Sequence, residues 1–200
     1  MRLFTRKRPS TEDSDIYPWM RGGGQAAAFN TWIAKALKLD KRRMDDKDLF
    51  PFGDEVADMK LYAHRTYSVE RFDEKVVSLQ ISTFDYTGGA HEAINETSLN
   101  WDMRAQKPIA LSDLFAKGEG WKRFVVGYCL KDLKGQNAEN PDRDNIEAVV
   151  RDGGNWLFAK DHAIVHFTVY TVASFAGGEY DVKIPYRALK PYLRPGAPVL

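Results

Sequence analysis

An aspartate and a histidine that flank a glycine-rich stretch are the first side chains here with the chemistry of a catalytic pair. Asp85 and His91 stand on either side of the stretch, which reads YTGGAH over residues 86–91. A carboxylate that orients an imidazole can support general acid–base catalysis, but the same pair is also common as a structural hydrogen bond. We expect His91 to hold the turn, and a hydrolase that uses Asp85 and His91 is the less favoured alternative.

Two further histidines have a spacing that can bind metal. His162 and His166 are four residues apart, and on a helix this spacing can hold one zinc ion when a glutamate follows the first histidine. Ala163 occupies that position, and the β-branched and aromatic residues around it predict a strand. In a strand the two side chains lie about 13 Å apart, at roughly 3.3 Å per residue. We therefore predict no metal site, with both histidines on the less apolar face of the strand.

The other common catalytic patterns are missing from the sequence. No serine stands in a Gly-x-Ser-x-Gly motif, and Cys129 falls on the apolar stripe of an expected helix, where a thiol stays protonated. The glycines at 22–24 lack the lysine and the spacing of a phosphate-binding loop. We expect no cofactor and no enzyme activity.

Composition limits the class of protein further. The 200 residues include 29 basic and 28 acidic side chains, a net charge of +1, and 44% are hydrophobic. A globular chain with balanced charge is not typical of nucleic-acid binders. A single cysteine excludes an internal disulfide framework. No segment has the roughly 18 to 20 apolar residues of a membrane span, and the basic residues at 2–8 precede a polar segment instead of the apolar core of an export signal.

Hydrophobic periodicity predicts an α+β fold. Apolar residues three and four apart predict a helix over residues 29–37, and alternation predicts strands over residues 61–72, 76–86 and 92–103. Within the last of these, Leu99 and Trp101 face one way, and Ser98 and Asn100 the other. Two helices and then a second glycine-linked hairpin over residues 162–184 follow. We predict an antiparallel sheet with helices on one face, in the order strands, helices, strands.

Composition and hydrophobic pattern also predict the domain boundaries. Residues 1–15 are polar and are expected to form a flexible tail. Residues 16–60 form a small helical and β unit packed on a main domain of residues 61–193. Residues 194–200, which contain two prolines, form a C-terminal tail.

Several motifs resemble a bacterial family of unknown function. They are Val77-Ser78-Leu79 leading to the 86–91 stretch, the segments Leu99–Asp102 and Leu111–Phe115, and the closing segments 170–179 and 182–186. The family supplies the extracytoplasmic, lysozyme-binding domain of RsiV-type anti-sigma factors, and it also occurs beside peptidoglycan deacetylase domains. Residues 17–33 are similar to the small unit that commonly precedes this domain.

The resemblance implies a non-catalytic, periplasmic or otherwise extracytoplasmic protein-binding domain. Its partner would be a lysozyme-like muramidase or a secreted wall-degrading toxin, which it would bind as inhibitor, immunity protein or sensor. A glycine-rich hairpin tip suits close approach to a glycan cleft, because glycine has no Cβ to collide with the wall. The candidate contact residues lie in two hairpin connections: Tyr86, Gly88, Gly89, Ala90, His91, Ser174, Phe175, Gly177 and Gly178.

A peptidoglycan-binding accessory module is the main alternative. Tryptophan rings stack on sugars, and the five tryptophans offer candidate faces, although four of them stand at positions that pack equally well inside the fold. Binding to isolated peptidoglycan, rather than to a hydrolase, would favour this alternative.

Overall fold

The computed structural model describes residues 2–7, 11–39, 61–88 and 90–200, and the side chains from residue 14 onward. The described residues form an α+β fold, as the sequence predicts. Contacts divide the chain into two compact units: Met1–Ser68 with Ile81–Asn95, and Val69–Gln80 with Glu96–Leu200. This division differs from the predicted boundary at residue 60, because long strands carry the chain from one unit into the other.

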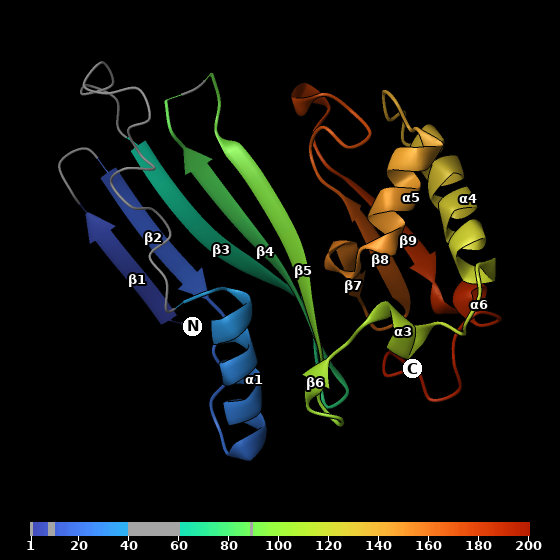
Figure 1. Ribbon diagram of the computed structural model, residues 1–200, viewed down its shortest axis with the longest axis horizontal. Helices are drawn as coiled ribbons and strands as arrows, with labels where there is room; N and C mark the ends of the chain where they lie inside the picture. The colour runs from blue at the N-terminus through green and yellow to red at the C-terminus, as the bar shows by residue number, and fades with distance from the viewer. Residues whose placement is uncertain (1, 8–10, 40–60, 89) are drawn as a thin grey trace. The chain divides into compact units, whose positions relative to one another are not determined.

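Three long strands follow the predicted alternation. β3 (Leu61–Phe72), β4 (Val76–Tyr86) and β5 (Ala93–Asp102) are consecutive neighbours in a sheet of order β1-β2-β3-β4-β5-β6 (Figure 1). The glycine-containing stretch after Tyr86 connects β4 to β5, as expected. Gly89, within this connection, lies outside the described residues.

The first unit contains a hairpin, a helix and parts of the long strands. β1 (Arg2–Lys7) pairs antiparallel with β2 (Thr11–Tyr17), and β2 pairs with β3 in parallel, so the sheet is mixed and not purely antiparallel. Helix α1 (Gly24–Ala36) buries Phe29 and Ile33 on one face, which confirms the predicted helical stripe. The Asn30 side chain fixes the entry of this helix by accepting from the Met20 N–H and donating to its carbonyl, each at 2.9 Å.

The predicted N-terminal tail is wrong over β1 and β2. The sequence of Thr11–Tyr17 is polar, and polarity without an apolar alternation was the reason to expect a tail. Strand pairing satisfies backbone N–H and C=O groups whatever the side chains are, so a polar segment joins a sheet when a strand edge is available.

The second unit carries most of the helices and a separate sheet. After β6 (Lys107–Pro108) come α3 (Leu111–Leu114), α4 (Gly120–Gly135), α5 (Arg143–Arg151) and η2 (Gly153–Asn155). An antiparallel sheet of order β7-β8-β9 follows. Its strands are β7 (Trp156–Phe158), β8 (His162–Phe167) and β9 (Tyr180–Pro185), with η3 (Phe175–Gly177) between β8 and β9 and α6 (Tyr186–Leu189) at the end.

Helices α4 and α5 pack together and cover one face of the β7–β9 sheet (Figure 1). The core of this unit contains an aromatic cluster: Phe115 stacks on Trp121 with ring centroids 4.2 Å apart, and both rings meet Trp156 edge-on. Cys129 is fully buried, and burial raises the pKa of its thiol to about 12, as expected for an inert core cysteine. No helix in the described segments is long and apolar enough to cross a membrane.

A buried hydrogen-bond chain joins β4 and β5 to β7. The Ser78 hydroxyl donates to the Asn100 side-chain oxygen at 2.7 Å, and the Asn100 amide donates to the Trp156 carbonyl at 2.7 Å. The Phe158 N–H donates back to the Ser78 oxygen at 2.9 Å. All of these groups are buried, so each bond replaces one that water would otherwise make.

The C-terminal segment is held by a buried arginine, which corrects the predicted C-terminal tail. Arg71 donates to the Ala159 carbonyl at 3.2 Å and to the Val199 carbonyl at 3.0 Å, and it pairs with Asp73 at 2.6 Å. Ala197 and Val199 belong to the core. Prolines prevent helix and strand in this segment, but they do not prevent burial of the apolar residues between them.

Replacing Asn100 with alanine should lower the free energy of unfolding by about 2 to 3 kcal/mol. The Trp156 carbonyl and the Ser78 hydroxyl would both lose a buried partner, and a buried polar group without one costs roughly 1 to 3 kcal/mol. Urea unfolding followed by tryptophan fluorescence measures the change. Asn95→Ala, at an exposed position on the same strand, is the control and should shift stability by less than about 0.5 kcal/mol. Equal effects of the two variants would contradict a stabilising role for these buried hydrogen bonds.

The Asp73 carboxylate should make stability depend on acid pH. Burial acts to raise its pKa, but hydrogen bonds from Arg71 and from the N–H groups of Val76 and Lys75 outweigh burial and hold it at about 2, below the ordinary 3.8. Its contribution is therefore complete above about pH 4 and is lost as the pH falls towards about 2.

Urea unfolding between about pH 2 and pH 7 tests this dependence. At neutral pH, Asp73→Asn should lose on the order of 2 kcal/mol, because hydrogen bonds to a charged group are the stronger ones. The difference from the wild type should shrink as Asp73 becomes protonated. Glu74→Gln, at the exposed neighbouring position, is the control and should show no such change with pH.

A candidate partner-binding loop and a buried histidine cluster

The connection from β8 to β9, residues 168–179, presents an exposed aromatic ring on an ordered backbone. Tyr170 is 60% exposed and has a φ of 66°, in the left-handed region. Within the hairpin predicted over residues 162–184, β8 ends at Phe167, and the Thr171 N–H turns back to bond the Thr168 carbonyl at 3.2 Å. The alternation of bulky residues in the sequence gives no sign of this turn.

The loop is tied to the segment between α4 and α5. The Glu139 carboxylate accepts from the Ser174 N–H at 2.7 Å and from the Ser174 hydroxyl at 3.1 Å. The Asn140 N–H donates to the carbonyl of Val172, whose side chain is buried. These bonds make the loop part of the packed structure and fix its backbone at Val172 and Ser174.

The two loop glycines are required by the fold itself. A Cβ on Gly177 would lie 2.6 Å from the Ala173 Cβ and 3.1 Å from the Glu139 carboxylate. Gly178 has a φ of 77° and ends η3 in a conformation that favours glycine. The glycines therefore shape the loop, whether or not a partner approaches it.

The remaining predicted residues of this loop are Ser174 and Phe175. Phe175 is half-buried, and its ring lies 5.8 Å from that of Tyr170 at an angle of 38°. Ser174 and Ala176 on either side are exposed. The loop thus offers two neighbouring aromatic rings with small residues beside them.

The 86–91 connection lies in the first unit and holds the other predicted residues. Tyr86 stacks on Tyr62, with ring centroids 5.6 Å apart, and Tyr62 donates to Glu92 at 2.6 Å. Gly88 has a φ of 97°, and Ala90 is exposed. The exposed His91 bonds the adjacent Glu92 carbonyl through Nδ1 at 2.8 Å.

His166 lies in a cluster of carboxylates within the second unit. Its Nδ1 bonds Asp181 at 2.8 Å, and its Nε2 bonds Glu96 at 2.5 Å. Glu179 completes the group, and its carboxylate, that of Glu96 and the imidazole each place a ligand atom within 4.8 Å of the others. The histidine is 7% exposed.

The charges in this cluster shift one another's protonation. Burial acts to lower the pKa of His166, but the hydrogen bonds and negative charges of Asp181 and Glu96 outweigh it and raise that pKa to about 9. Burial, the charge of Glu96 and a hydrogen bond with the Glu96 carboxyl raise the pKa of Glu179. Near neutral pH the cluster therefore holds an imidazolium among carboxyl groups.

The two histidines of β8 lie on the same strand face, four residues apart, but differ in burial. His162 is partly exposed and pairs with Asp161 at 2.6 Å, whereas His166 is buried. Their side chains therefore have separate partners, as the distance along a strand requires. The sequence interpretation missed Glu96, Glu179 and Asp181, because they come from β5, the loop end and β9, and no local spacing connects them to His166.

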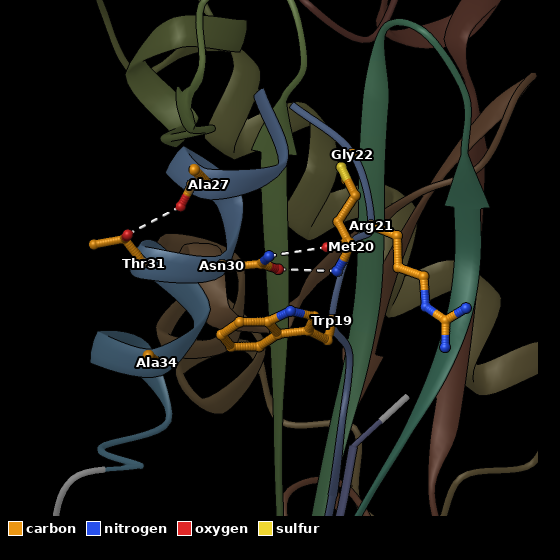
Figure 2. A pocket seen from close by; sticks show the side chains of 8 residues that line it. All are labelled: Trp19, Met20, Arg21, Gly22, Ala27, Asn30, Thr31 and Ala34. Carbon is orange, nitrogen blue, oxygen red and sulfur yellow. Dashed lines mark hydrogen bonds between the residues drawn. The ribbon is translucent and has the colours of Figure 1, made fainter. Parts of the chain in front are cut away.

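A surface pocket of about 700 Å³ lies beside α1 in the first unit. Figure 2 shows the Trp19 ring next to the hydrogen bonds that join Asn30 to Met20, with Arg21 and Thr31 also in the lining. Trp19 is half-buried, so part of its ring is open to solvent.

Comparisons with known proteins relate the chain to a domain of unknown function. Residues 112–187 match the family described as "Protein of unknown function (DUF3298)". The peptidoglycan-N-acetylmuramic acid deacetylase PdaC of Bacillus subtilis is 22% identical over 185 residues, which is 84% of this chain and 38% of the deacetylase. The chain therefore spans well under half the length of that relative.

Two solved structures share the fold. A DUF3298-family protein of Bacteroides fragilis has a TM-score of 0.70 and 18% sequence identity, with 94% of this chain and 86% of that chain covered. A DUF3298-family protein of Pseudomonas aeruginosa PAO1 has a TM-score of 0.64 and 14% identity, with 100% and 95% covered. Both confirm the predicted α+β fold class.

Replacing Gly177 with alanine should destabilise the protein by about 1 to 3 kcal/mol, because the new methyl group would have to displace Ala173 or Glu139. Gly127→Ala is the matched control. Gly127 lies within α4 with open space around its Cα, so alanine there should stabilise the helix by about 0.5 to 1 kcal/mol. Thermal unfolding measures both, and a neutral Gly177→Ala would show that the loop adjusts freely.

Proposed function

We propose that this protein is a non-catalytic, extracytoplasmic binding domain whose partner is a lysozyme-like cell-wall hydrolase. It would act as an inhibitor, an immunity protein or a sensor. The observation that carries the proposal is the exposed Tyr170 on the loop between β8 and β9, held in a left-handed backbone conformation.

Strain at an exposed aromatic residue indicates a functional constraint. A non-glycine residue in the left-handed region costs about 1 kcal/mol or more, and such residues concentrate in binding and active sites. The Tyr170 ring lies next to that of Phe175, and 60% of the residue stays exposed in the folded protein. A partner that covered the ring would bury the exposed part of it.

The loop is suited to binding because it is ordered before a partner arrives. Ser174 is fixed by Glu139, and Val172 is anchored in the core. A preorganised aromatic anchor loses little conformational entropy on binding, and tyrosine is among the residues that dominate interface energies.

The chemistry of a tyrosine ring also suits a residue that occupies a glycan-binding cleft. It offers a flat apolar face with a hydroxyl at its edge, and sugar rings present the same two features to a glycosidase cleft. In the cleft of a glycosidase, two carboxyl groups flank the glycosidic bond that is cleaved. A loop seated there would block the glycan sterically, without any reaction by its own residues.

The wall context comes from the relative whose name includes peptidoglycan deacetylase. It agrees with the resemblance to the lysozyme-binding domain of RsiV-type proteins. The connection between β4 and β5 offers a second set of candidate contacts: Tyr86, Gly88, Gly89, Ala90 and His91.

A peptidoglycan-binding module is the second candidate, and the pocket beside Trp19 favours it (Figure 2). The structure narrows the choice of stacking rings, because Trp101, Trp121 and Trp156 are buried. Trp19 and Trp32 are half-buried and could stack on a sugar.

Purified protein should bind at least one member of a panel of muramidases, with residual lytic activity falling in proportion to complex formed. Tyr170→Ala should weaken that binding by roughly tenfold to hundredfold, since a central aromatic anchor contributes about 2 kcal/mol or more. Phe72→Ala removes another aromatic residue that is 63% exposed, outside the loop, and should leave the affinity unchanged. Isothermal titration calorimetry measures each variant.

Two outcomes would contradict the hydrolase proposal. The first is that no muramidase of the panel binds at micromolar concentration. Sedimentation with isolated peptidoglycan that is lost in Trp19→Ala and kept in Tyr170→Ala would favour the glycan module instead.

A further inference from the structure

The cluster around His166 brings together side chains from three distant parts of the second unit. Glu96 stands on β5, His166 on β8, and Glu179 at the end of the loop before β9. An imidazole and two carboxylates form the donor set that borderline divalent metals such as Zn²⁺ accept.

Asp181 orients the imidazole for such a role. It is directly opposite His166 in the β8–β9 register, and it accepts from Nδ1 at 2.8 Å. That bond leaves Nε2 directed at the Glu96 carboxylate, 2.5 Å away. A histidine that ligates a metal through one nitrogen and bonds a carboxylate through the other is the usual second-sphere arrangement in metal sites.

The dimensions suit one ion. The ligand atoms of Glu96, His166 and Glu179 all lie within 4.8 Å of one another. Ligands at about 2.1 Å from a tetrahedral zinc are about 3.4 Å apart, so the Nε2 to Glu96 contact would have to open by about 1 Å. Glu179 is exposed and can adjust, and it leaves the cluster open to solvent for entry of an ion.

Charge also favours a cation. Three carboxyl groups surround one imidazole, and the Glu96 side chain is only 8% exposed. The Glu96 and Glu179 carboxyl groups lie close enough to repel each other, and a cation between them would relieve that repulsion. A dication at this position would contact both carboxylates and the imidazole at once.

We propose that Glu96, His166 and Glu179 bind a single divalent metal ion of the Zn²⁺ class, with Asp181 as the positioning residue for the histidine. The site is independent of the hydrolase-binding function proposed above. It differs from the excluded pairing of His162 with His166, because its other ligands come from β5 and from the loop before β9.

Calorimetric titration of the untagged, chelator-treated protein with ZnCl₂ tests the site. We expect one Zn²⁺ per chain, with MgCl₂ and CaCl₂ binding far more weakly because imidazole suits softer metals. Glu179→Gln, at an exposed ligand position, should weaken zinc binding at least tenfold without loss of fold. Asp181→Asn should weaken it by about tenfold to hundredfold, as for other second-sphere partners.

His162→Ala is the matched control, because it removes the other histidine of the same strand. It should leave zinc affinity unchanged, while His166→Ala abolishes stoichiometric binding; circular dichroism checks that each variant is folded. The proposal is wrong if the wild type takes up no stoichiometric zinc at millimolar concentration. It is equally wrong if Glu179→Gln binds as the wild type does, or if His162→Ala loses the ion.

Discussion

The buried side-chain amide of Asn100 is the interaction on which the second unit depends. It connects the Ser78 hydroxyl of β4 to the Trp156 carbonyl of β7, so it holds the long strands to the smaller sheet. Because both of its polar ends are satisfied inside the protein, the bond specifies one arrangement of these strands. A sliding or rotated arrangement would leave several buried groups without partners.

The same face of β5 extends this effect towards the candidate sites. Side chains alternate along a strand, so Glu96, Ser98 and Asn100 share one face. Ser98 bonds Gln80 at 2.9 Å, and Glu96 bonds His166. A row of polar side chains on one strand is thus buried and paired, and it places a carboxylate against β8.

Order in the β8–β9 loop follows from the packing around it. Glu139 reaches the loop from the segment between α4 and α5, and Gly177 is the residue that lets the backbone pass close to Ala173. Tyr170 is therefore displayed by a rigid scaffold, while Glu179 at the other end of the loop contributes to the His166 cluster. The exposed ring and the buried cluster are two consequences of one loop conformation.

Local periodicity by itself determined the helices, the long strands, the inert Cys129 and the α+β class. The spacing of apolar residues along the chain indicates which face of a helix or strand is buried. It also separated His162 from His166, since strand geometry fixes the distance between them. Only the tertiary structure decided that β1 and β2 join the sheet, that Val199 is buried, and that the polar face of β5 points inward. Those outcomes depend on which groups far apart in the chain become partners, and Glu96, His166 and Glu179 meet for the same reason. No spacing along the chain encodes that meeting, because it is set by strand register and by which segments of the second unit come to lie side by side.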